Sequence, residues 1–287
     1  MESPLVEQPY SSNQADRWRQ LRDLAKLTAL KQSPDGAFHL GHWWRGPLLY
    51  SLVRHYQPRH ILEFGTGRGY GAACMAQALL DAGLAGTVWT IDILPPTKPQ
   101  EWPIDEGDGP KLKQLTLQQV WTKHLSPNVT ERIRCLTGDS MSIMKGWHRR
   151  GLPQIDFCFI DGGHDYWTVK HDFMASLRVA NPGCSFLFDD YTERRGYGVK
   201  RLIDEEVAPK LPGEAIEVLD TLSKDRTVYG EEVKHKMLLL RGEYIRPMPL
   251  GQLYSLSAAR RFQWKYWLYA RIYRRMLHLR ALFLRKV

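Results

Sequence analysis

Short apolar runs alternate with longer helical runs through the middle of the chain. Because parallel strands need crossover connections that pack on both faces of a sheet, this order predicts an α/β fold with a doubly wound, Rossmann-like sheet. The five predicted parallel strands are residues 60–64, 87–92, 132–138, 154–161 and 184–190. The predicted helices between them lie near 70–83, 111–125, 140–150 and 167–180. Runs at 215–220 and 236–242 predict an antiparallel pair at one edge.

The sequence outside this alternation predicts a cap, a loop and a tail. Apolar residues in 15–30 recur at intervals of three and four, which indicates an amphipathic helix covering the domain. Residues 95–110 are rich in proline, glycine and acids, which predicts a loop that serves as a lid or as a plain connection. We expect a helical cap at 1–43, one large domain at 44–245 and a helical tail at 246–287.

The formal net charge of +9 comes from the C-terminal end of the chain. Residues 252–287 contain nine Lys or Arg residues and no acids, so the remaining 31 bases balance 31 acids. The spacing of apolar and basic residues in this segment predicts a basic amphipathic helix. Three functions remain possible for residues 254–287: contact with an anionic membrane surface, self-association as a homo-oligomer, and nucleic-acid binding. The neutral charge of the domain disfavours nucleic acid. The predicted apolar side of the helix consists of Phe262, Tyr266, Tyr269, Tyr273, Met276, Leu277 and Leu284.

The cellular compartment is predicted from the lack of targeting or membrane-spanning segments in the sequence and from the spacing of the cysteines. The N-terminal sequence has no apolar core of signal-peptide length, and no run of about 18 uncharged apolar residues occurs. The four cysteines lie far apart and lack the short spacings of metal or redox motifs. We therefore expect a cytoplasmic protein with reduced thiols, which the tail could bring to the periphery of a membrane.

A glycine-rich turn follows the first predicted strand, in the stretch ILEFGTGRGYG. Its glycines that alternate with other residues are Gly65, Gly67 and Gly69. Ligands of open α/β sheets bind at the carboxyl ends of strands, and a dinucleotide fingerprint would need a glycine in place of Tyr70. Asp92 ends the second strand, where an acid accepts hydrogen bonds from ribose hydroxyls. With Glu63 at the turn and no spare cation assigned to it, the pattern favours a positively charged ligand without phosphates.

A second group of acids follows the fourth and fifth predicted strands. Asp161, Asp189 and Asp190 should project from adjacent carboxyl ends into one cleft. Oxygen ligands of this kind favour a hard cation such as magnesium or calcium. The alternative is that these acids cap the helices that follow, because aspartate is a preferred N-cap residue.

The glycine turn resembles the first motif of the class I S-adenosylmethionine-dependent methyltransferases, which has the form E-x-G-x-G-x-G. Asp92 is similar to the ribose-binding acid of that family, and the Gly-Asp-Ser stretch at 138–140 is similar to its adenine-side contact. The resemblance implies S-adenosylmethionine as the cofactor. The residues it assigns to cofactor binding are Glu63, Gly65, Thr66, Gly67, Gly69, Asp92, Asp139, Ser140 and Asp161.

Residues 40–242 resemble more closely the O-methyltransferases related to the catechol and caffeoyl-CoA enzymes, including the macrocin-type and cephalosporin hydroxylase-like branch. The resemblance is densest in IDGGHDYWTVKHDF and NPGCSFLFDDY. It implies that Asp161, Asp189 and Asp190 bind a divalent ion, which holds the acceptor hydroxyl beside the methyl group. Many of these relatives have a catalytic lysine or a nearby aspartate after the first ligand, and this sequence departs from that pattern with His164 and Gly163 at the corresponding places.

Together these features predict a metal-assisted, S-adenosylmethionine-dependent O-methyltransferase that uses Mg²⁺ or another divalent cation. Its acceptor would be a small or glycosidic molecule with a hydroxyl group, such as a sugar or a phenol. We expect Asp161 and His164 to be catalytic, with the imidazole as the base near neutral pH. Two competing hypotheses are a cofactor-binding protein without transfer activity and a nicotinamide oxidoreductase. Aromatic candidates for the acceptor pocket, with core packing as the alternative, are Trp43, Trp44, Tyr166, Tyr191 and Tyr197.

Overall fold

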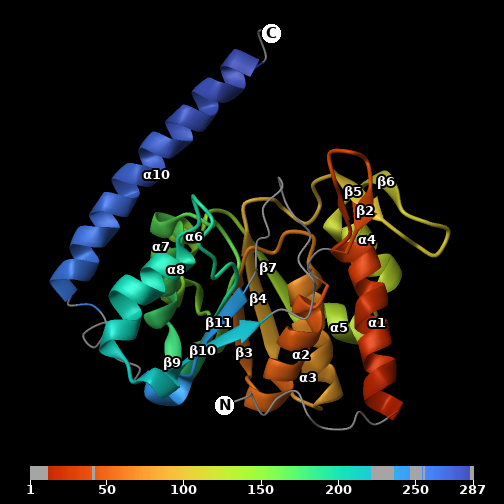
Figure 1. The fold of residues 1–287 in the computed structure, drawn as a ribbon, viewed down its shortest axis with the longest axis horizontal. Coiled ribbons are helices and arrows are strands. Elements are labelled where there is room, and N and C mark those ends of the chain that lie inside the picture. The colour runs from red at the N-terminus through yellow and green to blue at the C-terminus, as the bar shows by residue number, and fades with distance from the viewer. Residues whose placement is uncertain (1–11, 41–42, 221–235, 246–253, 255, 285–287) are drawn as a thin grey trace. The chain divides into compact units, whose positions relative to one another are not determined.

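The computed structural model describes residues 12–40, 43–220, 236–245, 254 and 256–284, and side chains beyond Ile272 are not described (Figure 1). The chain divides into two compact units. The first contains the described parts of Met1–Arg59 and Thr66–Gly138, and the second contains His60–Gly65, Asp139–Asp220 and the described residues after 235. No described helix combines the length and the apolar character that crossing a bilayer requires.

The first unit is built from five helices and three short strand pairs. Its elements are α1 (Ser12–Thr28), β1 (Lys31–Gln32), β2 (Phe38–His39), α2 (Arg45–Tyr56), α3 (Tyr70–Asp81), β4 (Thr87–Asp92), β5 (Gln100–Ile104), β6 (Lys111–Leu115), α4 (Leu117–His124), α5 (Pro127–Thr130) and β7 (Ile133–Thr137). Leu21 and Ala25 of α1 pack against Tyr70 and Cys74 of α3 in one buried cluster. The Tyr70 hydroxyl donates to the carbonyl oxygen of Trp43 at 2.6 Å. The N-terminal helix therefore covers α3, as its apolar spacing predicts.

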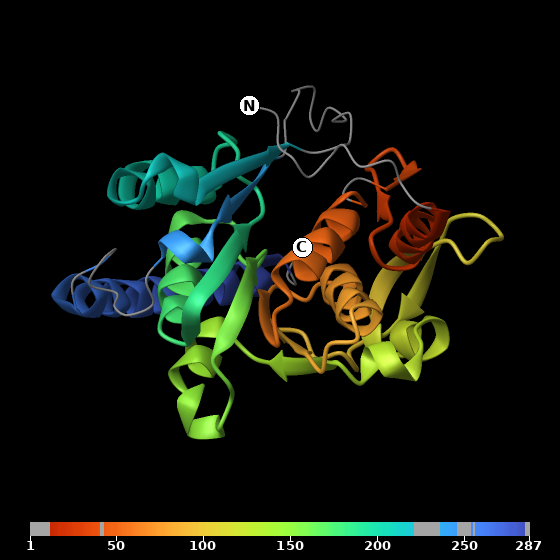
Figure 2. The ribbon, with the colours of Figure 1, turned by 90° about the horizontal axis from the view of Figure 1, so that it is seen from below.

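The second unit holds the remaining strands and the long C-terminal helix (Figure 2). Its strands are β3 (His60–Phe64), β8 (Ile155–Ile160), β9 (Ala180–Phe188), β10 (Ile216–Asp220) and β11 (Lys236–Leu240). Its α-helices are α6 (Ser140–Lys145), α7 (Tyr166–Leu177), α8 (Val199–Leu202) and α10 (Leu256–Leu284). Short 3₁₀ or π turns are η1 (His148–Arg150), η2 (Ile203–Val207), η3 (Ala208–Lys210), η4 (Gly213–Ala215) and η5 (Gly242–Tyr244).

The strand order confirms the predicted doubly wound α/β fold. The larger sheet has the order β10-β11-β9-β8-β3-β4-β7. In the second unit β3, β8 and β9 pair in parallel, and in the first unit β4 pairs in parallel with β7. Strand β11 runs antiparallel to both β10 and β9, so it alone is reversed among the described strands of the second unit, and the predicted antiparallel edge pair is present. Parallel strands buried on both faces explain why β8 reads as a nearly continuous apolar run.

The insert after β4 departs from its predicted loop. Residues 100–104 form β5, and 111–115 form β6 instead of the start of a helix, so both local predictions are wrong. Trp102 and Ile104 alternate inward from β5, and the Trp102 indole donates to the carbonyl oxygen of Leu27 at 2.7 Å. The hairpin is therefore fixed to α1 by a buried aromatic residue, an anchor that composition alone does not reveal.

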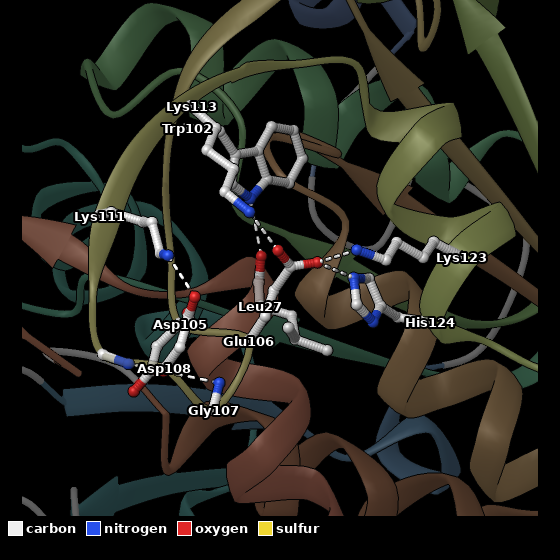
Figure 3. A network of polar contacts seen from close by, with 11 residues as sticks. Leu27, Trp102, Asp105, Glu106, Gly107, Asp108, Lys111, Lys113, Lys123 and His124 are labelled. Atoms are coloured by element: carbon white, nitrogen blue, oxygen red, sulfur yellow. Dashed lines mark hydrogen bonds and ion pairs between the residues drawn. The ribbon is translucent and has the colours of Figure 1, made fainter.

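A polar network ties the turn of this hairpin to α4 (Figure 3). The Glu106 carboxylate accepts from Lys113, from Lys123 at 2.5 Å and from His124 at 2.9 Å. Hydrogen bonds from the two lysines lower the pKa of Glu106 to about 2. An open cavity of about 570 Å³ runs beside this network, lined by Glu106, Lys113 and residues 115–116, 118–120 and 122–124. None of the predicted site residues lines it.

Candidate active site

The three positions of the turn require glycine for different structural reasons. All have positive φ, which is +89° at Gly65, +52° at Gly67 and +77° at Gly69. A Cβ at Gly65 would lie 2.2 Å from the carbonyl oxygen of Asp161, and one at Gly69 would lie 2.3 Å from Cζ2 of Trp121. A Cβ at Gly67 would meet nothing within 4 Å. Two glycines therefore permit close packing within the protein, whereas Gly67 leaves open space beside an exposed backbone, where a ligand can approach.

Asp92 fixes this turn. Its Oδ2 accepts from the backbone N–H of Gly67 at 2.8 Å, and its Oδ1 accepts from the N–H of Leu94 at 2.9 Å. The hydroxyls of Thr66 and Thr90 form a buried hydrogen bond of 2.6 Å that also joins the turn to β4. Each carboxylate oxygen can accept more than one hydrogen bond. Asp92 holds the turn and keeps acceptor capacity, and its contact with a ribose stays a prediction.

The predicted adenine-side residues have partners within the protein. The Asp139 carboxylate caps α6 by accepting from the N–H of Ser142 at 3.0 Å. The Ser140 hydroxyl donates to Oδ1 of Asp172 at 2.6 Å. Gly138, in the first unit, donates its N–H to the carbonyl oxygen of Asp92 at 2.8 Å. These contacts show structural roles, and contact of Asp139 and Ser140 with a cofactor stays a prediction.

Arg68 is a cation that the sequence argument overlooked. It stands inside the glycine turn, and its guanidinium lies 6.0 Å from the ring centroid of Trp102. Burial lowers its pKa, and Nη1 has no hydrogen-bond partner among the described residues. The premise that the turn lacks a spare cation is therefore wrong. The glycine spacing, with Tyr70 in place of a third fingerprint glycine, still disfavours a pyrophosphate site.

The carboxyl ends of the central strands of the second unit bring together an acidic cluster. Phe64 of β3 pairs with Ile160 of β8, which pairs with Phe188 of β9, so the three strands end side by side. Candidate ligand atoms of Asp161, His164 and Asp190 lie within 4.8 Å of one another. Asp189 is not in this group. Successive residues at a strand end tend to point in opposite directions, which explains why only one of the two aspartates joins the cluster.

His164 and Asp190 form a close pair within the cluster. Nδ1 of His164 lies 2.8 Å from Oδ2 of Asp190, and the imidazole is half exposed while Asp190 is buried. Asp190 has a φ of +55°, which is uncommon for any residue except glycine. Such backbone strain persists where the surrounding structure fixes it, and it occurs often at functional sites. The pairing with Asp190 orients the imidazole.

Tyr197 covers this pair from the loop after β9. Its ring stacks on His164 with centroids 5.1 Å apart and planes at 18°. Arg194 lies 5.1 Å above the same ring and donates to the Tyr197 hydroxyl at 3.3 Å. Burial, followed by the charge of Asp190, raises the pKa of Tyr197. Of the aromatic acceptor-pocket candidates, Tyr197 is thus the one shown to contact the cluster, whereas Trp44 is buried in the core of the first unit.

The ligand set fits a divalent cation. Two carboxylates beside one imidazole supply oxygen and nitrogen donors, which suit magnesium or manganese, with softer ions favoured if the imidazole binds. Mg²⁺ commonly uses one or two carboxylates and completes its coordination with water and substrate. Asp161 and Asp190 would therefore suffice to hold it. Participation of Asp189 stays a prediction.

Comparison with known families identifies the part of the chain that carries these features. Residues 62–191 match the family Methyltransf_24, described as a methyltransferase domain. These 130 of the 287 residues are similar to that methyltransferase family. They contain the glycine turn, Asp92 and all the acids of the cluster. The predictions of a methyltransferase and of its Rossmann-like fold are confirmed, while the match leaves the residues beyond 191 unassigned.

More distant similarities were found among curated proteins and solved structures. The uncharacterized protein y4gI of Sinorhizobium fredii is 26% identical over 159 residues, which are 55% of this chain and 16% of the relative. This chain therefore matches only about a sixth of that relative's length. An O-methyltransferase from Bacillus cereus in complex with SAH has a TM-score of 0.46 at 20% identity, covering 82% of this chain and 93% of that chain. The O-methyltransferase TomG from Streptomyces achromogenes, in complex with SAM, has a TM-score of 0.45 at 19% identity, covering 82% and 92%.

Proposed function

We propose that the methyltransferase domain transfers a methyl group from S-adenosylmethionine to a hydroxyl of a small acceptor, with a divalent cation at the acidic cluster. The observation that carries this proposal is the convergence of Asp161, His164 and Asp190 at the ends of β8 and β9. A methyltransferase acting on oxygen needs a group that holds the acceptor hydroxyl and a group that takes its proton. This cluster contains candidates for both.

Methyl transfer from a sulfonium is an in-line displacement, so the protein chiefly supplies alignment. The open backbone at Gly67 and the carboxylate of Asp92 would bind the methyl donor. Asp161 and Asp190 would hold the cation, which when bound lowers the pKa of a hydroxyl attached to it. His164, oriented by Asp190, would accept the proton of the acceptor hydroxyl. Tyr197 would keep the imidazole in place by stacking.

The acceptor is proposed to be a sugar or a phenol. Tyr197 beside the cluster offers an aromatic face, and such faces suit either class. The tail after residue 245 would contact a partner other than the acceptor, because its bases lie outside the methyltransferase domain.

The experiment is a methyl-transfer assay of the full chain with a panel of phenols and glycosides, with MgCl₂ or EDTA. We expect Asp190→Asn to abolish turnover and His164→Ala to lower kcat with unchanged SAH binding. Glu131→Gln, an exposed change at a residue that is not a member of the cluster, is the control. Equimolar SAH binding without turnover on any acceptor would favour the non-catalytic hypothesis. A thermal shift with NAD but none with SAH would favour the oxidoreductase hypothesis.

A further inference from the structure

The C-terminal helix α10 uses its predicted apolar side for packing inside the protein. Phe262 stacks on Trp167 of α7 with centroids 5.7 Å apart, and Tyr266 stacks on His171 at 4.3 Å. The side chains of α10 that are buried on this side are Ala259, Phe262, Tyr266 and Ala270. Figure 1 shows α10 as the long blue helix at the end of the chain. Its apolar side, up to the last described side chain, is therefore already covered by the domain.

The opposite side of α10 is also apolar, and it is exposed. Trp264 is 64% exposed, Trp267 44%, Leu268 40% and Ile272 51%. At about 100° per residue these four positions form one stripe, on the other side of the helix from Phe262 and Tyr266. The remaining large exposed apolar residues of the described chain are Ile93, Leu112 and Val218, which lie singly on other elements. A packed surface helix ordinarily has a polar outer side, so this concentration needs an explanation.

Bases are interleaved with these apolar side chains. The outer face of α10 consists of Trp264, Trp267, Leu268 and Ile272 together with Arg260, Arg261, Lys265 and Arg271. Among the described residues these four bases form no ion pair with an acid, and Arg271 lies 5.1 Å above the Trp267 ring. Residues 252–287 contain no acid at all. The outer face therefore combines exposed indoles and aliphatic groups with positive charge that no acid of the described residues pairs with.

We propose that the outer face of α10 docks on an anionic membrane surface, with the helix lying in the plane of the interface. Tryptophan prefers the boundary between headgroups and acyl chains, and arginine and lysine are attracted to anionic lipids. Pairing with the same face of a second copy would place four bases against four bases, which disfavours that occupant. A nucleic acid would use the bases but would leave Leu268 and Ile272 without a favourable environment.

The test is cosedimentation of the full chain with vesicles of phosphatidylcholine, with or without phosphatidylserine. We expect the protein to bind only the anionic vesicles, and we expect added salt to reduce this binding. The double variant Trp264→Ser/Trp267→Ser should bind these vesicles at least ten-fold more weakly than the parent. The substitutions Arg260→Gln and Arg271→Gln each remove one positive charge, and each should weaken binding to the anionic vesicles about five-fold. Leu112→Ser and Arg149→Gln, which remove an exposed apolar group and an exposed base elsewhere, are the matched controls.

All the changed side chains are exposed, so we expect each variant to keep the fold. Thermal unfolding of each variant checks this. Equal binding of the tryptophan variant and the parent would overturn the proposal, as would an absence of binding to anionic vesicles. A dimer that the same tryptophan changes dissociate, without vesicle binding, would assign the face to a second copy instead. RNA binding with no vesicle binding would assign it to nucleic acid. Methyl transfer to a soluble acceptor is measured separately, so either result leaves the proposed activity independently testable.

Discussion

Substituting the turn glycines one at a time should separate their structural and ligand-binding roles. In Gly67→Ala the new Cβ meets no atom within 4 Å, so the cost should be only the conformational term of about 1–2 kcal/mol for alanine at a φ of +52°. Gly65→Ala adds a Cβ 2.2 Å from the Asp161 carbonyl oxygen, so the backbone must move. Overpacking costs about 1–3 kcal/mol beyond the conformational term, which gives roughly 2–5 kcal/mol in total.

Two measurements distinguish these cases. By the usual scaling of about 2–4 °C per kcal/mol for large domains, Gly67→Ala should lower Tm by a few degrees and Gly65→Ala by roughly 4–20 °C. Isothermal titration with SAH should show at least a ten-fold loss of affinity for Gly67→Ala, because the new methyl group occupies the open space beside the backbone. Gly83→Ala is the matched control, since Gly83 has φ +66° and nothing within 4 Å, but lies at the end of α3.

Either of two results would refute this reasoning. If Gly67→Ala bound SAH as tightly as the parent, no ligand would approach the backbone at this position. If Gly65→Ala were as stable as Gly83→Ala, the close contact with Asp161 would not limit the side chain at this site.

Two further perturbations test the insert and the tail. The folded-state pKa of Glu106, about 2, lies below its ordinary value near 4.5, so its stabilising effect is complete above the ordinary value and is lost as pH falls toward 2. The Tm difference between the parent and Glu106→Gln should therefore be largest at neutral pH and should vanish near pH ~2; a pH-independent difference would contradict this. Phe262→Ala should lower the free energy of unfolding by about 3 kcal/mol and speed proteolysis of α10, since a buried ring that stacks on Trp167 is lost; unchanged proteolysis would mean that α10 is not held by this contact.

The parallel strands were predictable because each is a dense apolar run between helical segments. β5 and β6 were not, because the alternating pattern of residues 111–115 is short and polar, and its partner contains Pro103. Proline is rare inside strands, since it donates no hydrogen bond to a ladder. The hairpin depends on the contact of Trp102 with α1, which is distant in sequence and carries no local signal.

The candidate site shows the same division between local and distant information. Positions at the ends of β8 and β9 predict where Asp161 and Asp190 lie, because parallel strands end at one edge. The choice between Asp189 and Asp190 depends on a backbone turn at φ +55°, and no residue type dictates this turn. The partner of His164 and the stacking of Tyr197 depend on two loops that meet only in the folded chain. The sequence therefore predicts at which edge of the sheet the site lies. Which side chains contact one another there can be known only from the structure.

The backbone at Asp190 also decides which substitution gives a clean result. Aspartate and asparagine tolerate the left-handed conformation better than other residues with a side chain, whereas alanine there costs about 1–2 kcal/mol. Asp190→Asn therefore removes the charge facing His164 and keeps the backbone, so activity should fall while the free energy of unfolding changes little. Asp190→Ala loses activity through both charge and strain and cannot separate them. A fall in stability of Asp190→Asn equal to that of Asp190→Ala would show that the carboxylate supports the fold and would remove the main support for a catalytic role.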